Sequence, residues 1–146
     1  MSSAKDVSTY IIQKSSEPIS NLKLQKLLYY VQGWSLALKD KAAFNDRIEA
    51  WVHGPVVPAA FYEYRRFGWN PIDVGTATAS ISQDEMTHID DVLSIYGEHT
   101  ATELESSSHE ESPWLDARGE LDPKAPSKNE ITPEAMKKFF TARMNA

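Results

Sequence analysis

Residues 51–58, Trp-Val-His-Gly-Pro-Val-Val-Pro, constrain the fold of this chain more than any other stretch. Just upstream, apolar and polar side chains alternate through residues 47–52, which is the period-two pattern of a short half-buried strand. Gly54 and Pro55 end this strand, because Gly54 admits backbone conformations that other residues avoid and Pro55 lacks an N–H donor. Pro58 suits the first turn of a helix. The sequence therefore predicts a sharp strand-to-helix turn.

Two helices are predicted before this turn. Apolar residues at helical spacing predict the first over residues 4–14. The second begins at a cap formed by Ser20 or Asn21, and Gly33 in its interior predicts that another backbone approaches closely there. Its apolar stripe marks it as the core helix and consists of Leu24, Leu27, Leu28, Val31, Trp34 and Leu38.

Five further helices follow the turn, and each has a start signal. The signals are Pro58, the capping boxes Ser82/Glu85 and Thr100/Glu103, Ser112-Pro113 and Thr132-Pro133. Residues 74–82 and 119–129 predict surface connections, and residues 47–52 are expected to pair with the segment near Ile131. The predicted fold is mainly α, a compact single-domain helical bundle with a small β-strand pair, over residues 1–146.

Length and composition agree with a single domain. A chain of 146 residues can bury a core of its own, and 41% hydrophobic with 25% charged residues is ordinary for a globular protein. The chain has no cysteine, which excludes disulfides and thiol catalysis and fits a reducing compartment. Residues 1–6 lack the layout of a signal peptide, and no apolar run approaches the ~20 residues of a membrane span. We expect a cytoplasmic protein with no membrane partner.

The net charge of −6 is unevenly distributed. Residues 84–122 hold twelve acidic residues and one basic residue, Arg118. This acidic third is either a solvated face or a docking face for a basic partner. The lysines elsewhere are scattered rather than clustered, so we expect no direct contact with nucleic acid.

Motifs for chemistry are missing from the sequence. His109 is followed by two glutamates but supplies only one of the two histidines that a zinc-protease helix needs, and His88 is expected at the surface among aspartates. The six glycines are isolated, and no Gly-x-Ser-x-Gly elbow is present. We therefore expect no enzyme activity, no cofactor and no metal.

Aromatic and arginine side chains are concentrated at turns and helix ends. These residue types serve either as interface anchors or as plugs of a small core, and both interpretations stay open for each one. His53 and Tyr62 are the preferred pair, because a residue at the Gly-Pro turn and one on the next helix can share a groove. The set consists of Trp51, His53, Tyr62, Tyr64, Arg65, Trp69, Trp114 and Arg118.

Several motifs in order resemble the Panacea, or SocA-like, antitoxin domain. They are residues 22–30 (Leu-Lys-Leu-Gln-Lys-Leu-Leu-Tyr-Tyr), residues 51–58, then Tyr62, Tyr64 and Arg65, and finally His109, Pro113-Trp114 and Ala117-Arg118. Bacteria, plasmids and phages use that family to neutralise protein toxins. The resemblance covers most of the chain. With the anchors above, it implies a partner-binding set of Trp51, His53, Gly54, Pro55, Tyr62, Tyr64, Arg65, His109, Trp114 and Arg118.

The resemblance implies a non-enzymatic antitoxin that binds a cognate protein toxin. A variant within the family acts as a proteolytic adaptor, which would add a bacterial protease as a partner. The alternatives are a small ligand-binding regulator or hydrolase with a pocket around His53, His109 and Trp114, and a phage protein that binds a host factor. The sequence leaves the identity of the toxin and the oligomeric state open.

Overall fold

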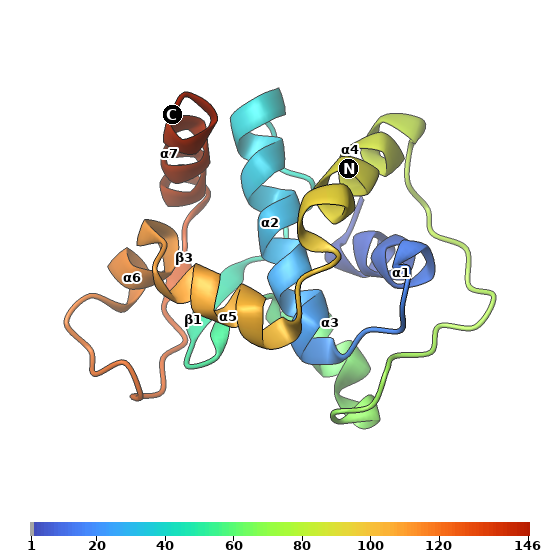
Figure 1. Cartoon of the computed structure of the whole chain (residues 1–146), viewed down its shortest axis with the longest axis horizontal. Coiled ribbons are helices and arrows are strands. Elements are labelled where there is room, and N and C mark those ends of the chain that lie inside the picture. Colours follow the sequence, from blue (N-terminus) through green and yellow to red (C-terminus); the bar gives the residue numbers. More distant parts are fainter. Residues whose placement is uncertain (1) are drawn as a thin grey trace.

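The computed structural model describes residues 2–146. Within this range the chain forms seven α-helices, one short 3-10 helix and three strands (Figure 1). The helices are α1 (Ala4–Lys14), α2 (Asn21–Lys39), α3 (Pro58–Tyr64), η1 (Arg65–Phe67), α4 (Gln83–Tyr96), α5 (Ala101–His109), α6 (Ser112–Arg118) and α7 (Pro133–Met144). The strands are β1 (Ile48–Trp51), β2 (Gly54–Val56) and β3 (Glu130–Ile131). The predicted mainly α fold is confirmed.

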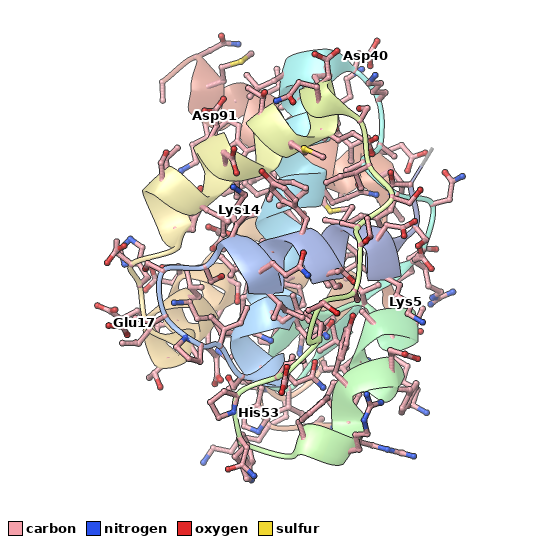
Figure 2. The ribbon with its side chains drawn as sticks, turned by 90° about the vertical axis from the view of Figure 1, so that its right-hand side faces the viewer. Lys5, Lys14, Glu17, Asp40, His53 and Asp91 are labelled. Carbon is pink, nitrogen blue, oxygen red and sulfur yellow. The ribbon has the colours of Figure 1, made fainter. Side chains whose placement is uncertain are left out.

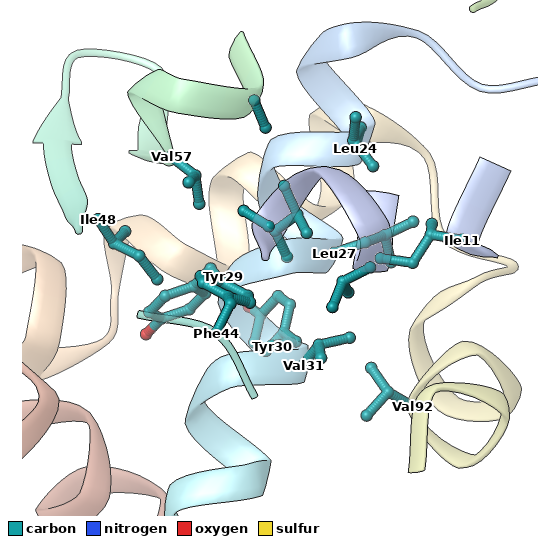
Figure 3. Packing of buried hydrophobic residues seen from close by; sticks show 14 of the residues in the cluster. Ile11, Leu24, Leu27, Tyr29, Tyr30, Val31, Phe44, Ile48, Val57 and Val92 are labelled. Carbon is teal, nitrogen blue, oxygen red and sulfur yellow. The ribbon is translucent and has the colours of Figure 1, made fainter. Parts of the chain in front are cut away.

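Helix α2 is the centre of the fold. Helices α1, α3, α4, α5 and α7 and strand β2 all contact it, so its middle turns are buried on every side (Figures 1 and 3). Leu24, Leu27, Leu28 and Val31 have no exposed surface, as the stripe predicted. Leu38 does not follow the prediction and is 57% exposed, because it lies in the last turn of α2, beyond the buried cluster.

Gly33 allows α7 to pack closely against α2, but through a side chain. A Cβ built on Gly33 would lie 2.1 Å from Cε2 of Phe140, so the phenyl ring occupies the space that any other residue would need. The sequence predicted a close approach by backbone at this position. The structure corrects the kind of contact, since an aromatic ring from α7 fills the gap.

The sheet has the order β2-β1-β3, with both pairings antiparallel. The expected pairing with the segment near Ile131 is confirmed, because Ile48 lies opposite Ile131. The predicted strand-to-helix turn is wrong in one respect, because residues 54–56 form an additional strand, β2, before α3 begins. In the β1–β2 hairpin, Gly54 lies opposite Trp51. Gly54 takes the hairpin turn with a φ of +107°, and Pro55 is accommodated because β2 is an edge strand.

The helix starts agree with their sequence signals. Both predicted capping boxes are present, at Ser82 with Glu85 and at Thr100 with Glu103, and Thr132 caps α7. His88 differs from its prediction, since only 6% of it is exposed and its Nε2 lies 2.9 Å from the carbonyl oxygen of Val31. The face of α4 that carries His88 packs on α2, and this burial lowers the pKa of the imidazole. In the described part of the chain, every helix is too short or too polar to cross a membrane.

Candidate functional site: an apolar groove beside the hairpin

A cavity beside the β1–β2 hairpin, here called the apolar groove, has a volume of about 580 Å³. Four segments form its lining. The start of α2 supplies Asn21, Leu22 and Gln25, and the hairpin supplies Trp51, Val52, His53 and Val56. From α3, η1 and the turn after them come Phe61, Tyr62, Arg65, Gly68 and Trp69, and from the connection before β3 come Pro126, Ser127 and Lys128.

Three aromatic rings form one wall of the groove. Trp51 and Phe61 pack edge to face with their centroids 5.0 Å apart, and Phe61 and Tyr62 do so at 5.5 Å. Tyr62 is nevertheless 49% exposed, and Trp69 at the same groove is 81% exposed. Exposed aromatic residues gathered at a cavity are the composition expected of a binding surface.

Polar side chains of α2 fix the backbone behind this wall. Gln25 accepts a hydrogen bond from the Val57 N–H (2.9 Å) and donates to Asn21 (2.8 Å), which in turn donates to the carbonyl of Phe61 (3.1 Å). Two of these bonds connect α2 to the N-cap and to the middle of α3, and the third joins the two side chains within α2. Because the two side chains are buried and their bonds are made within the chain, the groove is preformed.

Lys26 adds a fourth bond under the hairpin. Its side chain is fully buried, and Nζ donates to the carbonyl oxygen of Pro55 over 3.1 Å. Burial lowers the pKa of Lys26 to about 7, although the carboxylate of Glu105 opposes this shift. In the sequence, Lys26 is one of several scattered lysines, and its burial was not predicted. The bonds of Asn21 and Gln25 behind the groove were not predicted either, since polar residues on a helix usually face solvent.

The groove carries cationic groups at its edge. The guanidinium of Arg65 lies 5.3 Å from the centre of the Tyr62 ring, and Lys128 contributes an exposed ammonium group. His53 is exposed as well, and its Nδ1 is 3.4 Å from a carboxylate oxygen of Glu105. His53 and Tyr62 line the same groove, as expected for the preferred pair.

The remaining residues of the expected set lie outside the groove lining. Trp114 is 4% exposed and donates to the carbonyl of Trp51 over 2.8 Å. Arg118 is equally buried, donates to the carbonyl of Ala50 over 3.1 Å and lies 4.8 Å from the Trp114 ring. These bonds hold β1 in place. Direct contacts of Trp114 and Arg118 with a partner stay a prediction.

His109, Tyr64, Gly54 and Pro55 also serve the framework. His109 stacks on Trp114 with the centroids 4.2 Å apart, and burial lowers its pKa. Tyr64 is 3% exposed, and β2 holds Gly54 and Pro55 in a fully buried strand. The groove therefore has His53 in its lining but neither His109 nor Trp114, and the pocket expected around all three is corrected to one around His53.

A second group, here called the tyrosine cluster, lies between α2 and α7 and consists of Tyr29, Tyr30, Glu111 and Phe140. Tyr29 and Tyr30 donate to the two oxygens of Glu111 over 2.9 Å and 3.1 Å. Burial raises the pKa of Glu111, and the two tyrosine hydroxyls act against that rise. Phe140 packs on both tyrosines with edge-to-face geometry. The cluster was not predicted from the sequence, because Glu111 lies within the acidic third, whose side chains are expected at the surface.

The family model for the SocA-like antitoxin, Panacea domain, matches residues 24–115. The chain belongs to this family. The match includes the hairpin, α3 and η1, and therefore the aromatic wall and Trp69. The resemblance predicted from the sequence motifs is confirmed.

Antitoxin SocA of Caulobacter vibrioides (strain NA1000 / CB15N) is a curated relative. It is 41% identical over 70 residues, which are 46% of this chain and 36% of the relative. The alignment thus spans about a third of the length of that protein. No solved structure matches the chain.

Proposed function

We propose that this protein is an antitoxin that neutralises a cognate protein toxin by direct binding, and that the apolar groove is where the toxin docks. Membership of the SocA-like family supports the first part. The exposure of Trp69 and Tyr62 at the groove supports the second, because large aromatic side chains are the commonest anchors of protein interfaces.

Neutralisation by this groove needs binding energy and no chemistry. Asn21 and Gln25 already hold α3 in position and Lys26 holds the hairpin, so docking orders little of the antitoxin and loses little conformational entropy. In this proposal the protein acts in the cytoplasm and is not an enzyme. It occludes a functional surface of the toxin; the alternative is an adaptor that delivers the toxin to a bacterial protease.

The test combines growth with capture. The neighbouring gene is expressed as the candidate toxin, with and without the tagged protein, and bound protein is recovered. Wild type and Ile95→Ala should restore growth and retain the toxin, whereas Trp69→Ala with Tyr62→Ala should lose both. Ile95 is a matched control, because it is 59% exposed on α4 and does not line the groove.

Each other outcome is informative. Undiminished capture by the Trp69 and Tyr62 double variant would remove the groove as the docking site. A neighbouring gene product that is neither toxic nor bound would overturn the antitoxin function. Growth rescue in which the toxin disappears, and which requires a protease, would select the adaptor mechanism over occlusion.

The volume of the groove favours a second candidate, a small ligand-binding regulator. About 580 Å³ lies within the range of small-molecule sites, and the lining is mostly apolar with a few polar groups. A hydrolase has less support, since His109 and Trp114 do not line the groove with His53. Tryptophan fluorescence of the isolated protein, titrated with a metabolite library, should change on binding if this candidate is correct.

A further inference from the structure

Among residues 2–146, no aspartate or glutamate lines the apolar groove. Its lining contains two cationic residues, Arg65 and Lys128, and one histidine, His53. The whole chain has the opposite balance, with 21 acidic and 15 basic residues and a net charge of −6. The groove therefore combines an apolar wall with basic side chains, although the protein as a whole is acidic.

Two of these three groups have no acidic partner. Within residues 2–146, no carboxylate lies within 4.0 Å of the charged atoms of Arg65 or Lys128, as for most lysines and arginines of the chain; what sets these two apart is that they line the groove. His53 does have such a carboxylate, in Glu105. His53 lies at the end of the molecule where α3 and η1 are found (Figure 2). The two unpaired cations are thus available to a carboxylate from outside the chain.

We propose that the groove receives a short acidic and apolar segment of the toxin. Its bulky apolar side chains pack on the wall formed by Trp51, Phe61 and Tyr62, and its flanking carboxylates pair with Arg65 and Lys128. This inference rests on the proposed antitoxin function and states which part of the toxin the groove recognises. A basic segment would face two like charges and is rejected by the same geometry.

The exposure of Trp69 favours a protein segment over a small acid as the occupant. A molecule contained in the groove would leave much of a side chain that is 81% exposed in water. A polypeptide that continues past the groove can cover it.

The test compares two double charge reversals that change the net charge equally. Arg65→Glu with Lys128→Glu alters the groove. Arg66→Glu with Lys124→Glu alters two exposed cations that lie next to it in sequence but do not line it. We expect the dissociation constant of the captured toxin to rise roughly tenfold or more for the groove variant and less than about twofold for the control. Equal effects of the two variants would overturn the inference.

Overlapping 15-residue peptides of the captured toxin then identify the segment. Peptides that bind wild type but not Trp69→Ala should combine acidic residues with at least one bulky apolar residue, and their carboxamide versions, with Asn for Asp and Gln for Glu, should bind more weakly. Binding peptides that are basic or uncharged would overturn the inference. If Trp69→Ala abolishes capture while the groove charge variant binds as wild type does, the proposed function stands and this inference fails. A wild-type protein that captures no toxin overturns both.

Discussion

The apolar groove and the tyrosine cluster are both rich in aromatic residues, yet one is open and the other is closed. Tyr29, Tyr30 and Phe140 have no exposed surface, whereas Tyr62 is 49% and Trp69 is 81% exposed. Helix α7 covers the tyrosine cluster, and Glu111 accepts both tyrosine hydroxyls. In the groove, Asn21 and Gln25 bond to backbone groups, and the rings of Tyr62 and Trp69 stay exposed to water.

This difference shows how one residue type can serve folding in one place and binding in another. Burial of a tyrosine or tryptophan ring stabilises the chain most when its polar atom also finds a partner. The tyrosine cluster meets both conditions within the chain. In the groove, Trp69 and Tyr62 would be buried only when a partner binds. Mutations in the tyrosine cluster should therefore affect stability, and mutations in the groove should affect binding.

The largest effect on stability is expected from Glu111→Ala. The change leaves the hydroxyls of Tyr29 and Tyr30 buried without their acceptor, which should lower the free energy of unfolding by about 3–5 kcal/mol. Denaturant unfolding measures this change. Glu110→Ala is the control, because Glu110 is exposed, and it should stay within about 0.5 kcal/mol of wild type. A loss under about 1 kcal/mol in Glu111→Ala would contradict the role of the carboxylate.

Gly33→Ala should be the next most disruptive. The helix preference of alanine contributes about 1 kcal/mol, but the added methyl group overlaps the Phe140 ring, and overpacking of this kind costs about 1–3 kcal/mol or more. We expect a net loss of about 2 kcal/mol in denaturant unfolding. The double variant with Phe140→Leu should recover part of it. Purely additive losses would argue against a clash between these two residues.

The buried Lys26 under the groove predicts a pH dependence. Its folded pKa of about 7 lies below the ordinary value of 10.5, so between these values the unfolded chain binds the proton and the folded chain does not. The free energy of unfolding should therefore rise with pH, by about 2 kcal/mol from pH 7 to pH 9. Urea unfolding at several pH values checks this, and Lys26→Met should flatten the rise. A fall in stability over this range would refute the assignment.

The smallest effect on stability is expected in the groove. Trp69→Ala removes a side chain that makes little contact with the core, so its free energy of unfolding should lie within about 0.5 kcal/mol of wild type. Thermal or urea unfolding provides the measurement. A loss above about 2 kcal/mol would place Trp69 with the tyrosine cluster as a structural residue and would break the contrast between the two regions.

The parts of the fold that the sequence predicted depend on neighbours within a few residues. The capping boxes at Ser82 and Thr100 join residues three apart, and the start of α3 at Pro58 follows from its fixed φ. The family was also predictable, because its motifs are local runs. His53 and Tyr62 could be paired in advance, since the hairpin and α3 adjoin in the sequence.

Other features depend on which segments the fold brings together. Lys26 and Lys39 are both lysines of α2, yet Lys26 is buried and Lys39 is exposed. Lys26 is buried because the hairpin packs over it and Pro55 accepts its hydrogen bond, which its sequence neighbours do not reveal. Glu111 is buried for a similar reason, since its partners are about eighty residues away. Residues 126–128 could not be assigned to the groove either, because they belong to a connection with no periodic pattern.

The sequence by itself determined the helices, the sharp turn at Gly54-Pro55 and the family, because these depend on backbone preferences, local hydrogen bonds and short sequence motifs. Only the tertiary structure decided which aromatic residues became core and which remained open. That outcome depends on whether a distant element supplies a cover and a hydrogen-bond partner, as α7 and Glu111 do for Tyr29 and Tyr30. No segment of residues 2–146 covers Trp69 in this way, so its surface is left for a partner.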